Sequence, residues 1–153
     1  MKAVIVYDSV YGNTELVAKS IAKALEAAGH TPRLVHVRDA KGGVEGDILM
    51  MGSPTRIGTM TGRMKRFLKR MDGGTWGGKP VAAFDTEMQG MIEKDGASAA
   101  AKMHDLARKK GVRVHTPVLK VGVSEIRGPL SPGWEAGVEA YVKEFLAAAG
   151  SWG

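Results

Sequence analysis

The sequence predicts an α/β fold built on a doubly wound parallel sheet with helices on both faces. Short apolar runs alternate with helical stretches along nearly the whole chain, as in parallel strands joined by crossover helices. The strand runs, such as AVIVY near the N-terminus, lack polar alternation, which is typical of strands buried on both faces. With 153 residues, 44% of them hydrophobic and 25% charged, the chain fits one domain, residues 1–153.

The elements follow from their local patterns, taken in chain order. The first strand is a β-branched apolar run, and the first helix has apolar side chains at helical spacing, opens on Asn13 or Thr14 as a cap and stops at Gly29. The last strand has a possible break at Pro117. We expect strands at residues 2–8, 33–37, 47–51, 80–84 and 112–123, and helices at residues 13–28, 60–71, 98–110 and 132–149.

The composition excludes several kinds of chemistry. The chain has no cysteine, which rules out disulfides, thiolate-bound metals and a cysteine nucleophile, so redox chemistry would need a bound cofactor. Its four histidines are scattered without metal-ligand spacing, and we expect no metal site. No apolar run approaches the roughly 18 residues of a membrane span. No signal-peptide pattern precedes the first strand, so we expect a cytoplasmic protein.

The loop DSVYGNT, residues 8–14, is the first candidate for ligand binding. Parallel sheets bind ligands at the carboxyl ends of their strands, where the strand order reverses. The loop offers hydroxyls, an amide side chain and open backbone N–H groups at a helix N-terminus, which favour a phosphate. It lacks both the P-loop lysine and the G-x-G-x-x-G fingerprint, so a monophosphate held by neutral groups fits better. Taken alone, the stretch also fits a simple turn and helix cap.

Two further loops leave the strands that should neighbour the first one. In residues 51–60, MGSPTRIGTM, Pro54 fixes the direction of the chain and Gly58 allows a positive φ, so backbone amides can turn toward a ligand. Residues 84–90, FDTEMQG, supply polar side chains after the fourth strand. Each of these stretches would, by itself, also fit an ordinary connecting loop.

DSVYGNTELVAKSIAKAL and GSPTRIG together make the chain resemble the flavodoxins, and the resemblance covers nearly all of it. It implies the flavodoxin-like three-layer sandwich, with a five-stranded parallel sheet in the order 2-1-3-4-5. It also implies a non-covalently bound FMN that passes single electrons, with no side chain acting as a catalytic acid or base. The phosphate would lie on the first loop and the flavin ring between the second and third. The residues that the resemblance places at FMN are Ser9, Val10, Tyr11, Gly12, Asn13, Thr14, Pro54, Thr55, Arg56, Ile57, Gly58, Thr86, Glu87, Met88, Gln89 and Gly90.

The chain departs from the usual flavodoxin pattern in two places. Flavodoxins often have an acid after the glycine of the second loop and an aromatic residue in the third, whereas here Thr59 follows Gly58 and the third loop has no aromatic residue. The span GSPTRIGTMTGRMKRFLKR also resembles the tryptophan-repressor-binding type of NAD(P)H:quinone oxidoreductase. That gives the alternative function, an FMN-dependent NAD(P)H:quinone oxidoreductase. Those enzymes are longer and have a glycine-rich third loop, so an electron carrier is favoured.

The positive charge of the chain is local. The net charge is +6, and residues 56–70 carry six cations and no acid. On the predicted helix 60–71, five of these cations should face away from an apolar stripe. The face is either an ordinary solvated surface or a docking site for an acidic redox partner. Only Phe67, on the apolar stripe, interrupts the charges as an aromatic residue, so we expect no nucleic acid. These five cations are Arg63, Lys65, Arg66, Lys69 and Arg70.

Overall fold

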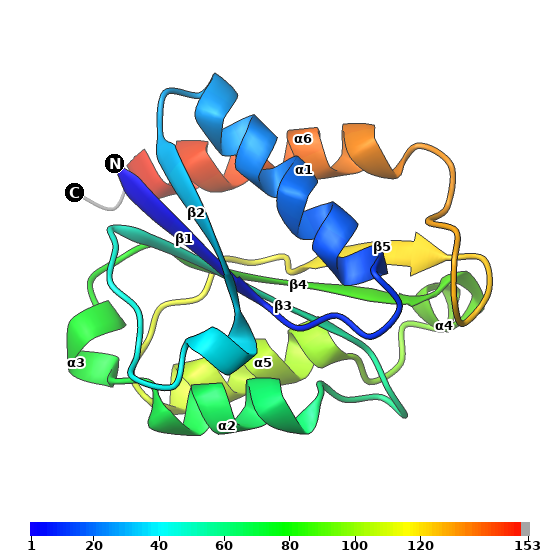
Figure 1. Ribbon diagram of the computed structural model, residues 1–153, viewed down its shortest axis with the longest axis horizontal. Helices are drawn as coiled ribbons and strands as arrows, with labels where there is room; N and C mark the ends of the chain where they lie inside the picture. Colours follow the sequence, from blue (N-terminus) through cyan, green and yellow to red (C-terminus); the bar gives the residue numbers. More distant parts are fainter. Residues whose placement is uncertain (151–153) are drawn as a thin grey trace.

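The computed structural model describes residues 1–150, so the last three residues of the predicted domain, 151–153, lie outside the described part. A five-stranded parallel sheet has the order β2-β1-β3-β4-β5, which confirms the predicted topology. Helices α1 and α6 cover one face, and α2, α3 and α5 cover the other (Figure 1). The strands are β1 (Lys2–Tyr7), β2 (Thr31–His36), β3 (Ile48–Pro54), β4 (Val81–Met88) and β5 (Leu119–Val123). The helices are α1 (Asn13–Ala27), η1 (Val37–Asp39), α2 (Gly62–Arg70), α3 (Gly73–Trp76), α4 (Gln89–Glu93), α5 (Ala99–Lys109) and α6 (Trp134–Gly150).

The sheet separates two hydrophobic cores, and the three central strands β1, β3 and β4 contribute to both because successive side chains point to opposite faces. In β1, Ile5 packs toward α1 and α6, whereas Val6 packs toward α2 and α5. Burial on both faces is therefore the physical reason for the unbroken apolar runs. The predicted apolar stripe of α2 is confirmed, since all of its members are buried in the core that contains Val6, between the sheet and helices α2 and α5. These members are Met60, Met64, Phe67, Leu68 and Met71.

Two central strands are longer than predicted. β3 continues to Pro54 and β4 to Met88, because Pro54 pairs with Thr86 and the end of β4 pairs with β5. The interpretation of residues 84–90 as a loop was therefore wrong. Thr86, Glu87 and Met88 belong to the strand, and Gln89 and Gly90 begin α4. The apolar run ends at Phe84, because polar residues occupy the last part of the buried strand. The sequence pattern therefore predicted a strand end that comes too early.

The start of α1 also differs from the prediction. Gly12 precedes the helix in the left-handed region with φ 92°, and as the N-cap residue it has no side chain that could cap the first turn. Asn13 and Thr14 are the first helical residues, so the predicted cap was wrong. Instead, Ser9 Oγ accepts the N–H groups of Gly12 at 3.1 Å and Glu15 at 3.4 Å, which folds the loop back on itself. A glycine suits this bend because it adopts positive φ without strain.

The last predicted strand was partly right. β5 occupies only the final part of residues 112–123, and the stretch before it contributes an isolated bridge between Val114 and Val81. The helix that follows, α6, packs Val138, Tyr141 and Phe145 against the sheet, on the stripe that its spacing predicts.

Candidate functional site

A cavity of about 370 Å³ lies at the carboxyl ends of β1, β3, β4 and β5. These strand ends and the loop into α1 gather on the right of Figure 1. Twelve of the sixteen residues expected at a cofactor line the cavity, and two others, Val123 and Ile126, join them. The lining residues are Ser9, Val10, Tyr11, Asn13, Thr14, Pro54, Thr55, Arg56, Ile57, Thr86, Glu87, Met88, Val123 and Ile126.

The remaining four expected residues do not line the cavity. Gly12 forms the bend before α1, and Gly58 lies in the turn of the second loop against Ala97. Gln89 and Gly90 lie in the first turn of α4, outside the cavity. The cavity therefore includes most of the expected residues of the first two loops, and the third only through its strand residues.

The first loop presents unused hydrogen-bond donors. Within residues 1–150, no protein acceptor meets the backbone N–H groups of Val10, Tyr11, Asn13 or Thr14. These amides surround the N-terminus of α1, where the helix dipole adds positive potential. Thr14 itself is buried, and its hydroxyl shares a 2.8 Å hydrogen bond with the hydroxyl of Thr86. The loop can thus bind an anion mainly through its backbone.

The second loop forms a tight turn with an exposed isoleucine at its tip. Arg56 and Thr59 exchange two backbone hydrogen bonds of 2.8 and 3.1 Å, and Ile57 and Gly58 lie between them at φ 50° and 72°. Two consecutive positive φ angles define a type I′ turn, which usually carries glycine, asparagine or aspartate. Ile57 is β-branched and 103% exposed, so the turn holds a strained apolar side chain at the cavity with no protein surface covering it.

Two buried acids, Asp85 and Glu87, lie two residues apart in the C-terminal half of β4. Burial raises the pKa of Asp85 from 3.8 to about 6, although its carboxylate accepts hydrogen bonds from the amide of Ala100 and the hydroxyl of Thr55. Burial, and then the charge of Asp85, raise the pKa of Glu87 from 4.5 to about 7. Lys120 on β5 opposes this rise from 4.0 Å away. The cavity therefore holds an acid that titrates near neutral pH.

The loop between β5 and α6 is a part of the site that the sequence reasoning missed. The side-chain amide of Asn13 donates to the carbonyl of Arg127 at 3.0 Å, and the Arg127 guanidinium carbon lies 5.5 Å from the centre of the Tyr11 ring. Gly128 approaches so closely that a Cβ there would meet Asn13 Oδ1 at 2.8 Å. The available signal was topological, because in a parallel sheet the loop after β5 must lie on the same edge as the others.

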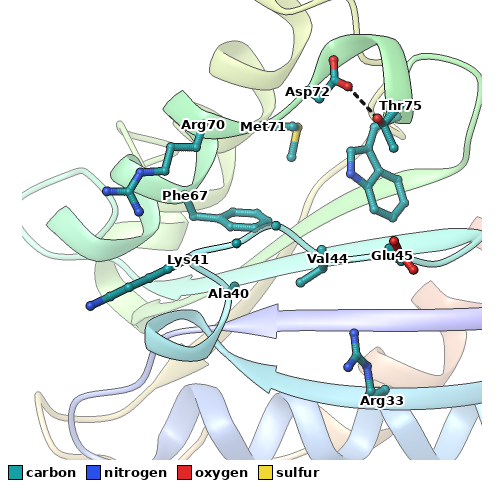
Figure 2. A pocket seen from close by; sticks show the side chains of 13 residues that line it. Arg33, Ala40, Lys41, Val44, Glu45, Phe67, Arg70, Met71, Asp72 and Thr75 are labelled. Atoms are coloured by element: carbon teal, nitrogen blue, oxygen red, sulfur yellow. Dashed lines mark hydrogen bonds between the residues drawn. The ribbon is translucent and has the colours of Figure 1, made fainter.

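A second hollow lies at the β2 edge, far from these loops. It measures about 630 Å³ and lies between residues 40–45 and the end of α2 (Figure 2). Its cations Arg33, Lys41 and Arg70 are mixed with acids, and Asp72 is already used to cap α3 through Gly74 and Thr75. It contains none of the expected site residues, so the strand-end cavity is the candidate site.

None of the helices in residues 1–150 is long and apolar enough to span a membrane. The same residues contain no group of three His, Asp or Glu side chains placed to hold a metal ion.

Comparisons with known proteins agree on one family. The flavodoxin family model matches residues 5–126. A flavodoxin from Aquifex aeolicus is 36% identical over 91 residues, which cover 56% of this chain and 49% of that protein, so the chain spans about half the length of this relative. Flavodoxin 1 from Bacillus cereus has a similar structure, with a TM-score of 0.77 at 19% identity over 96% of this chain and 98% of that one. A WrbA-like flavodoxin from Agrobacterium tumefaciens gives a TM-score of 0.74 at 19% identity over 99% of both chains. Matched over most of its length, the chain belongs to the flavodoxin family, whose proteins bind FMN and transfer electrons to redox partners.

Proposed function

We propose that this chain binds FMN in the strand-end cavity and carries electrons between redox partners. The observation that carries the proposal is the set of unused amide N–H groups at the N-terminus of α1, opening on a cavity with an exposed apolar side chain, Ile57, at its rim. A phosphate matches the first feature, because it accepts several hydrogen bonds and is favoured by the helix dipole. A flat, largely apolar ring matches the second.

The residues fit FMN in detail. The backbone of residues 9–14 would hold the phosphate, with Gly12 shaping the bend. The ring would lie between residues 54–58 on one side and Thr86, Glu87 and Met88 on the other, with Gly58 completing the turn that presents Ile57. The orphaned Oε1 of Glu87 offers this ligand a polar partner inside the cavity. Bound FMN supplies the one-electron redox chemistry, and the protein supplies position, shelter from water and charge. We further propose that residues 1–153 form one domain; the cytoplasmic location stays a prediction.

The finer proposal is an acidic redox partner on the exposed face of α2. All five cations of this face are exposed, so their charges can attract an acidic surface, although Arg63 Nε also lies 3.4 Å from Asp8 Oδ2. The other four are Lys65, Arg66, Lys69 and Arg70. The helix is tied to the site: the hydroxyl of Thr61 at its cap donates to Asp8 at the end of β1 at 2.7 Å. A partner guided to the N-terminal end of this face would therefore meet the molecule near the second loop, on the side of the cavity. Its association rate should fall steeply with salt, because exposed charges are screened.

Titration of the purified protein with FMN tests the proposed function. We expect the fluorescence of the flavin to change on binding with a saturable, one-to-one stoichiometry. Rapid oxidation of NADH by quinone in the loaded protein would instead favour the quinone oxidoreductase alternative. A protein that binds no FMN would leave the cavity without its proposed ligand and overturn the proposal.

A further inference from the structure

Glu87 is a buried acid with an unsatisfied oxygen in the cavity wall. Its exposed fraction is 4%, and Oε1 has no hydrogen-bond partner within residues 1–150. The residue lines the cavity together with Ile57 and Met88. Buried polar atoms are nearly always hydrogen-bonded, because an unpaired one has lost its hydrogen bonds to water without gaining others. Binding of the flavin ring does not by itself require a buried carboxylate. The presence of one with an unpaired oxygen therefore needs a separate explanation.

The positive charges near Glu87 compensate only part of the negative charge of its carboxylate. On its own strand, Asp85 is fully buried two residues earlier. On β5, Lys120 Nζ lies 4.0 Å from Glu87 Oε1 but 3.5 Å from the exposed Asp95, so one cation is shared between two acids. From the second loop, Arg56 lines the same cavity. The pKa of Glu87, about 7, reflects this balance, with burial and Asp85 outweighing Lys120.

We propose that Glu87 is the proton-binding group of the cavity, taking up one proton as an electron enters the site and releasing it as the electron leaves. This inference rests on the proposed function. The electron comes from a reduced partner protein, and the proton comes from solvent and forms one O–H bond on the Glu87 carboxylate. When the electron passes to the oxidised partner, that O–H bond breaks and the proton returns to solvent. The net charge of the site is therefore the same before and after.

The physical reason is the cost of adding negative charge to a sheltered cavity that already holds carboxylates. A new negative charge beside Glu87 raises its proton affinity further, because like charges disfavour ionisation. An acid whose pKa lies near neutral pH is well placed to respond, since a modest rise changes it from mostly ionised to mostly protonated. An acid with an ordinary pKa near 4.3 would stay ionised throughout.

The test compares one-electron midpoint potentials of the FMN-loaded full chain across pH for the unmodified protein, Glu87→Gln and Asp95→Asn. Protons bound by the flavin itself are common to all three and cancel in the differences. We expect the potential of the unmodified protein to fall below that of Glu87→Gln as pH rises above neutral. One proton per electron changes the equilibrium tenfold per pH unit, which is about 59 mV, and this is the largest expected slope of the difference. Asp95→Asn removes an acid that is 92% exposed and frees Lys120 for Glu87, so this variant should keep a pH-dependent potential, with the fall beginning at lower pH than in the unmodified protein.

A second measurement uses the protein without FMN. Carbon-13 NMR of the glutamate side-chain carboxyls should show a resonance that titrates near pH 7 and disappears in Glu87→Gln. Titration of that resonance at an ordinary glutamate pKa, or a difference in potential that does not vary with pH, would each overturn the role of Glu87. Failure to bind FMN would overturn the proposed function itself, so the two failures are distinguishable.

Discussion

Replacement of Ile57 by glycine should make the protein more stable and a weaker binder of FMN. The side chain is fully exposed in the FMN-free fold, so its removal sacrifices no buried apolar surface. A non-glycine residue at positive φ, here 50°, costs about 1–2 kcal/mol, which glycine would not incur. Glycine loses about 0.5–1 kcal/mol through the greater freedom of its unfolded chain. We therefore expect a net gain of about 0.5–1 kcal/mol in the free energy of unfolding.

The effect on binding should have the opposite sign. If Ile57 covers the flavin ring, the glycine variant loses the burial of most of one isoleucine side chain on binding. That is worth about 1–2 kcal/mol, so the FMN dissociation constant should rise roughly 5- to 30-fold. Urea unfolding of the FMN-free protein measures the first effect, and fluorescence titration with FMN measures the second.

The variant Ile57→Ala separates the effect of backbone strain on stability from the effect of the side-chain contact on FMN binding. Alanine keeps a Cβ at the same positive φ, so it should lose affinity as glycine does without gaining as much stability. The reasoning is refuted if glycine lowers the free energy of unfolding, or if it binds FMN as tightly as the unmodified protein.

Three further predictions concern Asp85, Gly52 and Arg127. The pKa of Asp85 rises from 3.8 to about 6 on folding, so its protonated form stabilises the fold below about pH 4 and that contribution is lost as pH rises through 6. Asp85→Asn should therefore raise the free energy of unfolding near pH 8 by up to about 3 kcal/mol and flatten its pH dependence between about pH 4 and 6; an unchanged pH profile in chemical denaturation would contradict this. Gly52→Ala puts a Cβ 2.1 Å from the Phe84 ring and should cost at least about 1–3 kcal/mol, whereas Gly78→Ala meets no atom within 4 Å and should change denaturation little. Arg127→Gln should weaken FMN binding several-fold and leave riboflavin binding unchanged, because Arg127 lies against the loop proposed to hold the phosphate; equal losses for both ligands would place its effect elsewhere.

The sequence was most informative where one local pattern decided the structure. The alternation of apolar strands and amphipathic helices predicted the parallel sheet, because each element must bury its own apolar face, and the resemblance to flavodoxins gave the strand order. The first loop was identified from its hydroxyls, glycine and position after a buried strand. In both cases each element or loop could be recognised from its own short stretch of consecutive residues.

The features that escaped prediction depend on distant partners. The strand state of Thr86 and Glu87 comes from pairing with Pro54 and with β5, which their polar side chains do not signal. The contact of Asn13 with Arg127 joins residues 114 apart in the chain, so the fourth loop could be found only from the topology. The positive φ of Ile57 runs against residue preference, and such conflicts are typical of functional sites.

Amide chemical shifts provide the most direct test of the central claim, that the backbone of the first loop binds the phosphate of FMN. Nitrogen-15 spectra of the isotope-labelled protein would be recorded with FMN and, separately, with riboflavin, which lacks the phosphate. We predict that FMN strongly shifts the amides of Val10, Tyr11, Asn13 and Thr14, and that riboflavin shifts those of Ile57 and Met88 while leaving the first loop nearly unchanged. Shifts confined to the hollow around Phe67 and Arg70, or no shift in the first loop with FMN, would contradict the account.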